Sequence, residues 1–600
     1  MKKILSLTLS VVLLMSAIVT LPVMAQPSDE DIQASIDLGI SWLVGNQNLD
    51  GSWGAWPYDV AYTGFALIKL QDRAYELGYE DPFDPEYPYS DNVIAGWEYI
   101  FKTDPDGVAL RVLKRGMVDQ DHTGGASGTL DDPDSNGNGY GLTFGTYDHT
   151  HTYTTGIVLM ALEASGTPSR SCGVDFDGDG VPDSFFDVAQ DAVDWLSFAQ
   201  GDSGHDEGGW FYTADSAGAP RQHEASGSYD TDNSNGGYAV LGLAAAEGFG
   251  CGVPDWVKTE LDVWIITLQD PVDGDADDGG SWYRPEWSWV NELKTGNLIF
   301  EMTFYGDDPS VGRFQDALDY IVRHWNDQNQ DPGWRGSWRF DNDGDGSVDE
   351  DPFNGVDDDG DGLIDEDSPV AHYQAMYCLM KGFEYSQVDL IDLDGVGDPE
   401  HDWYAEFAQC ILDGQHPDGH WGHGNWGDDF LNTVWALLTL EKVTPPPPTI
   451  TVSVDIKPGS WPNPFNKKAK GVFVVAICGT EDFDVTEIDP GTVELVLSLE
   501  DSVAVSPLRW TYEDVATPYE DMTPDDPDGH ELEGDGYLDL VFHFKRQEVV
   551  GLGLCEYSDG EYVKLYLVGN LKGENGEGPP IRGFDWIRVQ FKEGKGKGKP

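Results

Sequence analysis

The stretch Gln47-Asn-Leu-Asp-Gly-Ser-Trp-Gly54, or QNLDGSWG, lies between two apolar segments whose periodicity predicts helices. Its glycines, carboxylate and single large aromatic residue suit either part of an active site or a structural turn. The order of an amphipathic helix, a Gly/Trp loop and a second, more apolar helix recurs six times between residues 30 and 443. Because a residue set that repeats around a protein cannot form one asymmetric active site, we interpret the stretch as structural.

Three residue types mark the repeats. A tryptophan follows the loop glycine in five units, and a glutamine ends or closely follows the first helix in four. Small residues such as Gly156 and Gly296 precede the apolar part of the second helices, where they let helices approach closely. We expect the glutamine to bond near the end of its own helix, and the tryptophan to pack over the joint with its N–H satisfied. The markers are Trp53, Trp210, Trp282, Trp338 and Trp421, with Gln47, Gln200, Gln269 and Gln415.

The Q-x-x-D-G-S/H-W-G loops at Gln47–Gly54 and Gln415–Gly422 resemble the repeat signature of squalene–hopene cyclases and protein prenyltransferase β-subunits. The resemblance implies an all-α (α/α)6 toroid over residues 30–443, with the first helices outside and the more apolar second helices inside. It implies much less about activity, because one fold supports many functions.

The catalytic residues of these families are not matched. Squalene–hopene cyclases protonate their substrate with an Asp-x-Asp-Asp motif, and the chain has these letters at Asp275–Asp278. They lie inside the fourth Gly/Trp loop instead of opening an inner helix, so we interpret them as a solvated or metal-binding loop. His372 and Cys378 do not reproduce the prenyltransferase zinc site, because six residues apart they face different sides of a helix. The Gly-Cys-Gly-Glu sequence of complement-like toroids is absent.

Polar and aromatic residues at the starts of the second helices are candidates for the lining of the toroid cavity. Hydroxyl, imidazole, carboxylate and aromatic groups around one mouth suit a sugar chain or a peptide. They also suit acid–base chemistry of the kind found in polysaccharide lyases. The alternative is that they cap or solvate helix ends. The candidates are Asp59, Tyr62, His149, His151, Tyr153, Asp230, Asp232, Glu292, Lys294, His372, Tyr373, Asp428 and Asp429.

Two acidic inserts, 175–187 and 341–367, contain three loops with oxygen ligands at alternate positions and glycine at the sixth. Calcium takes about six to eight oxygens, and the glycine permits the sharp turn around it. The loops resemble the short calcium loops of dockerin-like and thrombospondin-type-3 segments. We expect several calcium ions and no organic cofactor, and the alternative is a solvated acidic loop. The predicted ligands are Asp175, Asp177, Asp179, Val181 and Asp183, then Asp341, Asp343, Asp345, Ser347 and Asp349, then Asp357, Asp359, Asp361, Leu363 and Asp365.

Degenerate versions of the calcium pattern begin at Asp132 and at Asp392. A fourth loop with the same spacing lies near the C-terminus. Its predicted ligands are Glu531, Glu533, Asp535, Tyr537 and Asp539.

The C-terminal part differs in periodicity. A proline-rich linker, 444–449, precedes short β-branched and aromatic runs separated by turn signals, which predict an all-β sandwich over residues 450–592. The run IKPGSWPNPFN and the run that follows it resemble an accessory module of exported archaeal and bacterial proteins. The basic tail, 593–600, is expected to be disordered.

The N-terminus and the composition indicate export. Residues 1–25 read as a secretory signal peptide, with a retained anchor helix as the alternative. The net charge of −75 disfavours nucleic acid and anionic lipid as partners and suits divalent cations or high salt. Export permits disulfides, for which Cys172–Cys251, Cys378–Cys410 and Cys478–Cys555 are plausible pairs, and buried free thiols are the alternative.

The sequence thus predicts an exported calcium-binding protein at the cell surface or outside the cell, with no membrane insertion once the signal is removed. We expect it to bind a glycan or a cell-envelope protein. Two alternatives remain: a toroid-fold enzyme such as a polysaccharide lyase or hydrolase, and a terpenoid cyclase-like enzyme, which only the repeat favours.

Overall fold

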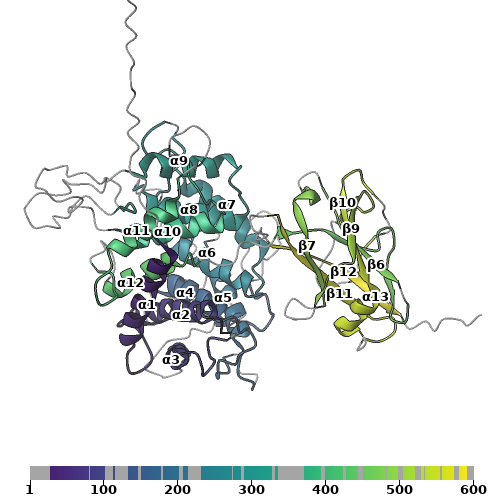
Figure 1. Ribbon diagram of the computed structural model, residues 1–600, viewed down its shortest axis with the longest axis horizontal. Helices are drawn as coiled ribbons and strands as arrows, with labels where there is room; N and C mark the ends of the chain where they lie inside the picture. The colour runs from purple at the N-terminus through teal and green to yellow at the C-terminus, as the bar shows by residue number, and fades with distance from the viewer. Residues whose placement is uncertain are drawn as a thin grey trace, which may run out of the picture.

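The computed structural model consists of a helical region followed by a C-terminal β region, as the sequence predicts (Figure 1). The signal peptide, the linker, the basic tail and the insert 341–367 lie outside the residues it describes. Those are 27–79, 81–101, 113–114, 133–145, 150–176, 180–201, 207–213, 231–272, 274–284, 289–326, 332–335, 371–393, 399, 401–422, 428–443, 450–469, 471–480, 483–497, 504–519, 527, 529–530, 532, 534–554, 557–572 and 580–590.

The helices of the first region come in consecutive pairs. The first members are α1 (Asp29–Gly45), α3 (Ser90–Ile100), α5 (Phe185–Ala199), α7 (Asp255–Leu268), α9 (Gly312–His324) and α11 (Trp403–Asp413). The second members are α2 (Asp59–Glu76), α4 (His151–Ala164), α6 (Asn233–Gly248), α8 (Glu292–Tyr305), α10 (Tyr373–Tyr385) and α12 (Asp429–Leu440). A two-stranded ribbon of β1 (Leu113–Lys114) and β2 (Tyr140–Gly141) lies in the loop between α3 and α4.

The even-numbered helices contact one another in a closed order. α2 contacts α4, and the contacts continue through α6, α8 and α10 to α12, which in turn contacts α2. Nearly all residues of α8 are buried, whereas α9 buries one face through Phe314, Ala317, Tyr320 and Ile321. Polar side chains of α8, among them Glu292, Lys294 and Glu301, are buried as well, whereas the amphipathic sequence of α9 is typical of a helix that covers a surface.

Glycines bring two pairs of even helices into close contact. A Cβ atom added at Gly242 of α6 would overlap the backbone of Gly156 in α4, and one added at Gly382 of α10 would overlap that of Gly296 in α8. The predicted role of Gly156 and Gly296 in close helix packing is therefore confirmed.

The repeat glutamine joins neighbouring pairs of helices, and our expectation that it bonds at the end of its own helix is wrong. Gln47 Nε2 donates to the carbonyl of Gly51 in its own loop, at 2.9 Å, and to that of Asn92 in α3, at 3.0 Å. Equivalent pairs of bonds are made by Gln200 to Gly208 and Val257, by Gln269 to Gly279 and Arg313, and by Gln415 to Gly419 and Ser35.

The loop glycine explains why this bridge recurs. Gly51 has a φ of +91°, and a Cβ atom there would overlap the carbonyl oxygen of Ala95 in α3. A residue with a side chain would be excluded both by its backbone conformation and by this contact. The equivalent glycines, each with positive φ and pressed against the next odd-numbered helix, are Gly208, Gly279 and Gly419.

The loop tryptophans pack as predicted in three units. Trp53, Trp210 and Trp421 are fully buried, and each indole N–H donates to a carbonyl near the end of the preceding helix, at 2.6–2.9 Å. Thr63 Oγ1 of the next helix accepts the backbone N–H of Trp53, and Thr433 accepts that of Trp421.

The register of the fourth and fifth units needs correction. In the fourth, Ser281 donates its backbone N–H to Thr295, so the buried Ser281 occupies the position of Trp53, and Trp282 lies one residue further on. In the fifth, Trp334 donates its indole N–H to the carbonyl of Trp325 and is buried, which is the role we predicted for Trp338. Trp338 lies outside the described residues.

The C-terminal region contains two sheets. One has the order β4 (Val454–Ile456), β6 (Val472–Ile477), β10 (Asp539–Lys545) and β9 (Arg509–Glu513). The other has the order β3 (Ile450–Thr451), β12 (Pro580–Gln590), β11 (Tyr562–Leu571), β7 (Ile488–Val496) and β8 (Ala504–Val505), and β5 (Pro464–Asn466) also pairs with β12.

Alternate residues of β11 and β12 are buried, and apolar residues of both sheets share one core. The β-branched and aromatic runs predicted as strands overlap β3, β4, β6, β7, β10, β11 and β12, whereas β5, β8 and β9 were not predicted. A helical turn, α13 (Arg546–Val549), follows β10.

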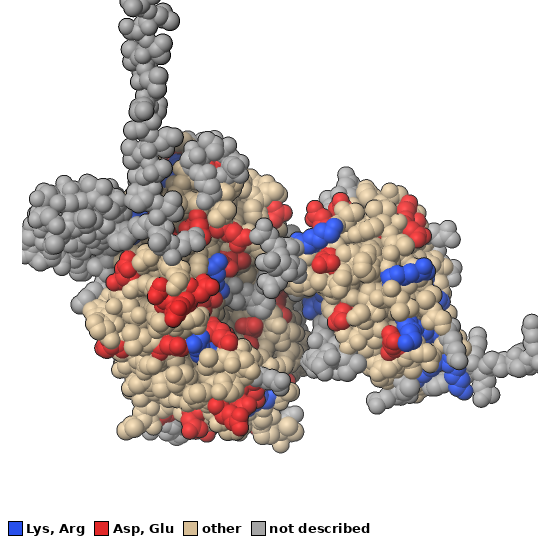
Figure 2. Space-filling model, viewed as in Figure 1, with Lys and Arg blue, Asp and Glu red and all other residues tan. Residues whose placement is uncertain are grey.

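On the face shown in Figure 2, the helical region carries many more acidic than basic side chains, whereas Lys and Arg are more frequent on the β region. None of the described helices has the length and apolar character needed to cross a membrane. The five cysteines that the structure describes are all free thiols, so the pairs Cys172–Cys251 and Cys378–Cys410 are not bonded.

Candidate functional site

The starts of the even-numbered helices meet around one end of the helical region. Tyr62 of α2 donates to Asp428, the N-cap of α12, at 3.3 Å, and its ring stacks on Phe430 with centroids 4.9 Å apart. On the other side, Asn233 of α6 donates to the carbonyl of Lys294 in α8 at 3.1 Å. Side chains from helix pairs that are far apart in the sequence are therefore placed together.

Aromatic side chains dominate this end, in a group that we call the tyrosine belt. Tyr58 and Tyr62 stack at 6.4 Å, and Tyr153 lies 6.4 Å from Tyr212 and 6.5 Å from Tyr238. Tyr58 is 46% exposed, and the other members are half-buried. The belt consists of Tyr58, Tyr62, Tyr153, Tyr212, Tyr238 and Tyr283.

Tyr238 of the belt also contacts the interior of the helical region. Its ring lies 6.1 Å from Phe65 of α2, and Lys381 Nζ of α10 lies 5.4 Å from its centroid. Residues of α2, α4, α6 and α10 therefore meet at this one ring.

One side of the belt carries charge. Tyr212 and Tyr283 lie with their hydroxyls 3.4 Å apart, and Lys294 Nζ lies 3.7 Å above the ring of Trp289, which contacts Tyr283. Asp232 is 2% exposed, and burial raises its pKa. Burial, followed by the charge of Asp232, also raises the pKa of Tyr283. This corner combines a phenol pair, a carboxylate and an ammonium group.

Several predicted cavity residues act as helix caps, which is the alternative interpretation of the sequence. Asp232, His372 and Asp428 each accept the backbone N–H of the residue three positions later. The His372 ring is buried, which lowers its pKa to about 4.

Other predicted cavity residues contact the protein itself. Asp59 accepts the hydroxyl of Tyr99 at 2.6 Å, His151 Nδ1 bonds Thr213, and Glu292 accepts the N–H of Trp334. Tyr373 is buried, and Asp429 lies 3.8 Å from His420. His149 and Asp230 lie outside the described residues.

The predicted calcium ligands are described only in part. Asp175 Oδ2 accepts the N–H of Gly180, the sixth residue of its loop, which has a φ of +96°. Asp183 Oδ2 accepts the N–H of Phe176, so the carboxylates at both ends of the loop face its interior backbone. Val181 is exposed. Asp177, Asp179, Glu531, Glu533 and all the ligands predicted between Asp341 and Asp365 lie outside the described residues.

The predicted ligands of the C-terminal calcium loop differ from one another in burial and in their contacts. Asp535 accepts the N–H of Tyr537, and Tyr537 is exposed. Asp539 is fully buried, and its carboxylate accepts the backbone N–H groups of Gly479, Val515 and Ala516. These bonds give Asp539 a structural role at the start of β10.

The predicted register of a related loop is wrong by two residues. The turn we placed at Asp132–Gly137 begins two residues later, because Asp134 Oδ2 accepts the N–H of Gly139, as Asp175 does with Gly180. Asn136 and Asn138 both donate to Asp191 Oδ1 of α5, at 2.8 and 2.9 Å. The D-x-N-x-N-G spacing in the sequence could have indicated the correct start of this loop.

Buried charges inside the helical region were not predicted. Lys69 is fully buried and pairs with Glu441 at the end of α12, and burial lowers its pKa. Burial raises the pKa of Glu163 to about 8, with the nearby Asp72 as the second cause. Glu301 is fully buried, neither of its oxygens has a hydrogen-bond donor among the described residues, and its pKa is raised to about 8.

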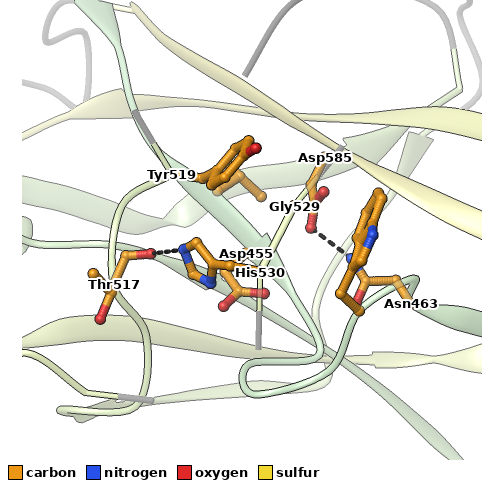
Figure 3. Close-up of a pocket in the computed structure, with 9 residues that line it drawn as sticks. Asp455, Asn463, Thr517, Tyr519, Gly529, His530 and Asp585 are labelled. Carbon is orange, nitrogen blue, oxygen red and sulfur yellow. Dashed lines mark hydrogen bonds between the residues drawn. The ribbon is translucent and has the colours of Figure 1, made fainter. Parts of the chain in front are cut away.

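A small pocket lies in the β region, between β4 and β12 (Figure 3). Asn463 donates to Asp585 across it, and His530 lies within hydrogen-bonding distance of the carbonyl of Thr517. The pocket is lined by Val454, Asp455, Trp461, Asn463, Thr517, Tyr519, Gly529, His530 and Asp585.

Comparison with known proteins gives weak structural similarity. No protein-family model matches the sequence, and no curated protein matches it significantly. A protein from Actinoplanes aligns with a TM-score of 0.31 and 14% identity, over 68% of this chain and 99% of its own. The ent-copalyl diphosphate synthase from Streptomyces platensis aligns with a TM-score of 0.19 and 13% identity, over 70% of this chain and 96% of its own. At these scores the alignments carry no functional argument.

Proposed function

We propose that the chain is an exported, calcium-stabilised protein that binds a glycan at the tyrosine belt. In this proposal residues 30–443 form an (α/α)6 toroid and residues 450–592 a β-sandwich. The closed order of contacts among the even-numbered helices supports the toroid, and the core shared by two sheets supports the sandwich. The apolar segment within residues 1–25 supports export to the cell surface or beyond.

The observation that carries the proposal is the belt itself. Tyrosine offers a large flat apolar face for the C–H side of a sugar ring and a hydroxyl for hydrogen bonds at its rim. Buried polar groups beside it, such as Asp232 and Lys294, would fix the orientation of a bound residue. The acidic surface favours a neutral or basic glycan, because an acidic one would be repelled unless calcium bridged it.

Glycan-array binding followed by calorimetric titration of the full-length protein tests this proposal. Tyr58→Ala is the main variant, because an exposed tyrosine can be removed with little effect on folding. We expect it to weaken binding about tenfold, the loss of one good stacking contact. Tyr512→Ala, which removes a comparably exposed tyrosine from β9, is the control. Absence of glycan binding, or equal affinities of the two variants, would contradict the proposal.

The corner formed by Tyr212, Tyr283, Asp232 and Lys294 favours a second candidate, a polysaccharide lyase. A phenol beside a cationic group can act as a general acid or base in eliminative cleavage. A lyase would release unsaturated products, detectable by ultraviolet absorbance. Tyr283→Phe should then abolish product release and leave glycan binding intact. Absence of unsaturated products from every glycan that binds would exclude this candidate.

A further inference from the structure

The pocket between β4 and β12 is too small for an organic ligand (Figure 3). Its volume of about 10 Å³ corresponds to one water molecule or one ion. Asp455 comes from β4, Asp585 from β12 and Asn463 from the turn that precedes β5. The pocket is therefore walled by elements of both sheets.

Two oxygen atoms at this pocket receive no hydrogen bond from the residues that the structure describes. Asn463 is 2% exposed, and its Nδ2 donates to Asp585 Oδ2 at 3.0 Å and to the carbonyl of Trp586 at 3.1 Å. These bonds fix the orientation of the amide and leave Oδ1 as an acceptor. Among the described residues, no group donates to Asn463 Oδ1 or to the buried Asp455 Oδ2. Such atoms are normally satisfied by a partner, an ordered water or an ion.

Two carboxyl groups line the pocket. Asp455 and Asp585 both belong to the lining, and no Lys or Arg side chain does. His530 is the only basic side chain in the lining given above, and its Nδ1 accepts the N–H of Leu532. Its Nε2–H therefore donates to the carbonyl of Thr517.

We propose that this pocket binds one calcium ion through Asp455, Asn463 and Asp585. Carboxylate and amide oxygens are the ligands calcium prefers, and main-chain carbonyls and water would complete its coordination. The ion would be bound by two carboxyl groups that line one pocket, and it would satisfy both oxygens to which the described residues supply no donor. A water molecule could also donate to these oxygens, and the ion count described below distinguishes the two occupants.

This site is distinct from the calcium loops predicted from the sequence and does not depend on glycan binding. Asp585 Oδ2 also accepts the N–H of Ile456, which ties β12 to β4 at 2.6 Å. An ion held at this point would join the two sheets. Calcium would therefore stabilise the β region, separately from any effect on the helical inserts.

Counting bound ions in the full-length protein tests the proposal. The protein is stripped with chelator, equilibrated with calcium and analysed for calcium per chain. Asp455→Asn should bind one ion fewer than the wild type. Glu548→Gln, which removes an exposed carboxylate from the same region, should bind the wild-type number. Equal counts in the two variants would overturn the proposal and indicate a water molecule in the pocket.

Hydrogen exchange of the wild type gives a test that does not depend on whether a variant folds. Calcium should slow exchange of the Ile456 and Trp586 amides, both of which donate to Asp585, at least tenfold. The amide of Val475, on the neighbouring strand β6, should change much less, because it is not a donor to the pocket. Unchanged exchange at Ile456 and Trp586 would also overturn the proposal, whatever the glycan experiments show.

Discussion

The side-chain amide of Gln415 donates a hydrogen bond to the main-chain carbonyl of Ser35 at 2.9 Å, and Ser35 Oγ donates one back to Gln415 Oε1 at 2.8 Å. The two residues are 380 positions apart, so this pair joins the last pair of helices to the first helix. The same bridge between consecutive pairs is made by Gln47, Gln200 and Gln269.

Replacement of Gln415 by Ala should destabilise the protein. The change leaves the carbonyls of Ser35 and Gly419 without this donor, and we expect a loss of about 1–3 kcal/mol in the free energy of unfolding. Urea denaturation measures it. Gln409→Ala is the control. It removes only an exposed hydrogen bond from Gln409 of α11 to Asp413, so it should cost well under 1 kcal/mol. Equal losses would show that the bridge does not contribute to stability.

Replacement of Gly419 by Ala should have a larger effect. Gly419 has a φ of +105°, and the new Cβ would overlap the carbonyl of Leu38 in α1. We expect a loss of roughly 2–4 kcal/mol, from backbone strain together with steric overlap. Gly45→Ala is the matched control, because nothing lies within 4 Å of a Cβ there. A Gly419→Ala protein that melts at the wild-type temperature would contradict this account of the loop.

Replacement of Trp53 by Ala should cost about 3–5 kcal/mol, because the indole is fully buried and donates to the carbonyl of Leu43. Leu49→Ala in the same loop should have almost no effect, since Leu49 is exposed. Because the tryptophan is structural, a folded Trp53→Ala protein should keep its ligand specificity. A stable variant that had lost ligand binding would instead place Trp53 in the binding site.

The burial of Glu301 predicts that the stability of the protein depends on pH. Its folded-state pKa of about 8 lies above the ordinary glutamate value of 4.5, so the folded protein holds the proton more tightly than the unfolded chain. The resulting stabilisation is complete below about pH 4.5 and is lost as the pH rises through 8. Lys381 of α10 faces the carboxylate and lowers its pKa, while Gly236 of α6 contributes no charge.

Glu301→Gln should therefore match the wild type near pH 4 and exceed its stability near pH 8, by a few kcal/mol. Thermal melts across this range measure the difference. Exposed Glu548→Gln should follow the wild type at every pH. A gap between Glu301→Gln and the wild type that does not change with pH would rule out a titrating carboxyl at this position.

Removal of calcium tests the predicted inserts. Chelator should lower the melting temperature and make residues 340–368 more susceptible to protease, because their carboxylates would repel one another without the ion. Restoring calcium should reverse both effects, and the same concentration of magnesium should do so less well. Unchanged melting and proteolysis would leave these segments as solvated acidic loops.

The sequence predicts the repeating elements better than their register. Gly-Gly-Ser-Trp in the fourth unit offers two candidates one residue apart for the position of Trp53, and residue type favours Trp282. The structure selects Ser281, because only its N–H reaches Thr295. The choice depends on which backbone N–H meets a hydroxyl on another helix, and one-dimensional spacing does not contain that distance.

The prediction of the site residues is limited in the same way, because the sequence does not contain the distances between helix pairs. Helix-start residues such as Asp232 and Tyr62 were identified because an N-terminal position can be read from periodicity. Tyr212 and Tyr283 were missed, because they lie in loops and reach the belt only when the helix pairs close. Glu301 was missed because an acid in the interior of a helix gives no indication of which helix will face it.

Because Gln415 bonds to α1, the last helix pair packs against the first in the same way as consecutive pairs pack. A glutamine and a glycine join one helix pair to the next at four places. At one of these the last pair meets the first, and its contacts are equivalent to the others although the chain is not continuous there. A circularly permuted chain, opened at the loop before α7 and joined from α12 to α1, would keep all four bridges. Its order of helices along the chain would differ, and its order in space would not.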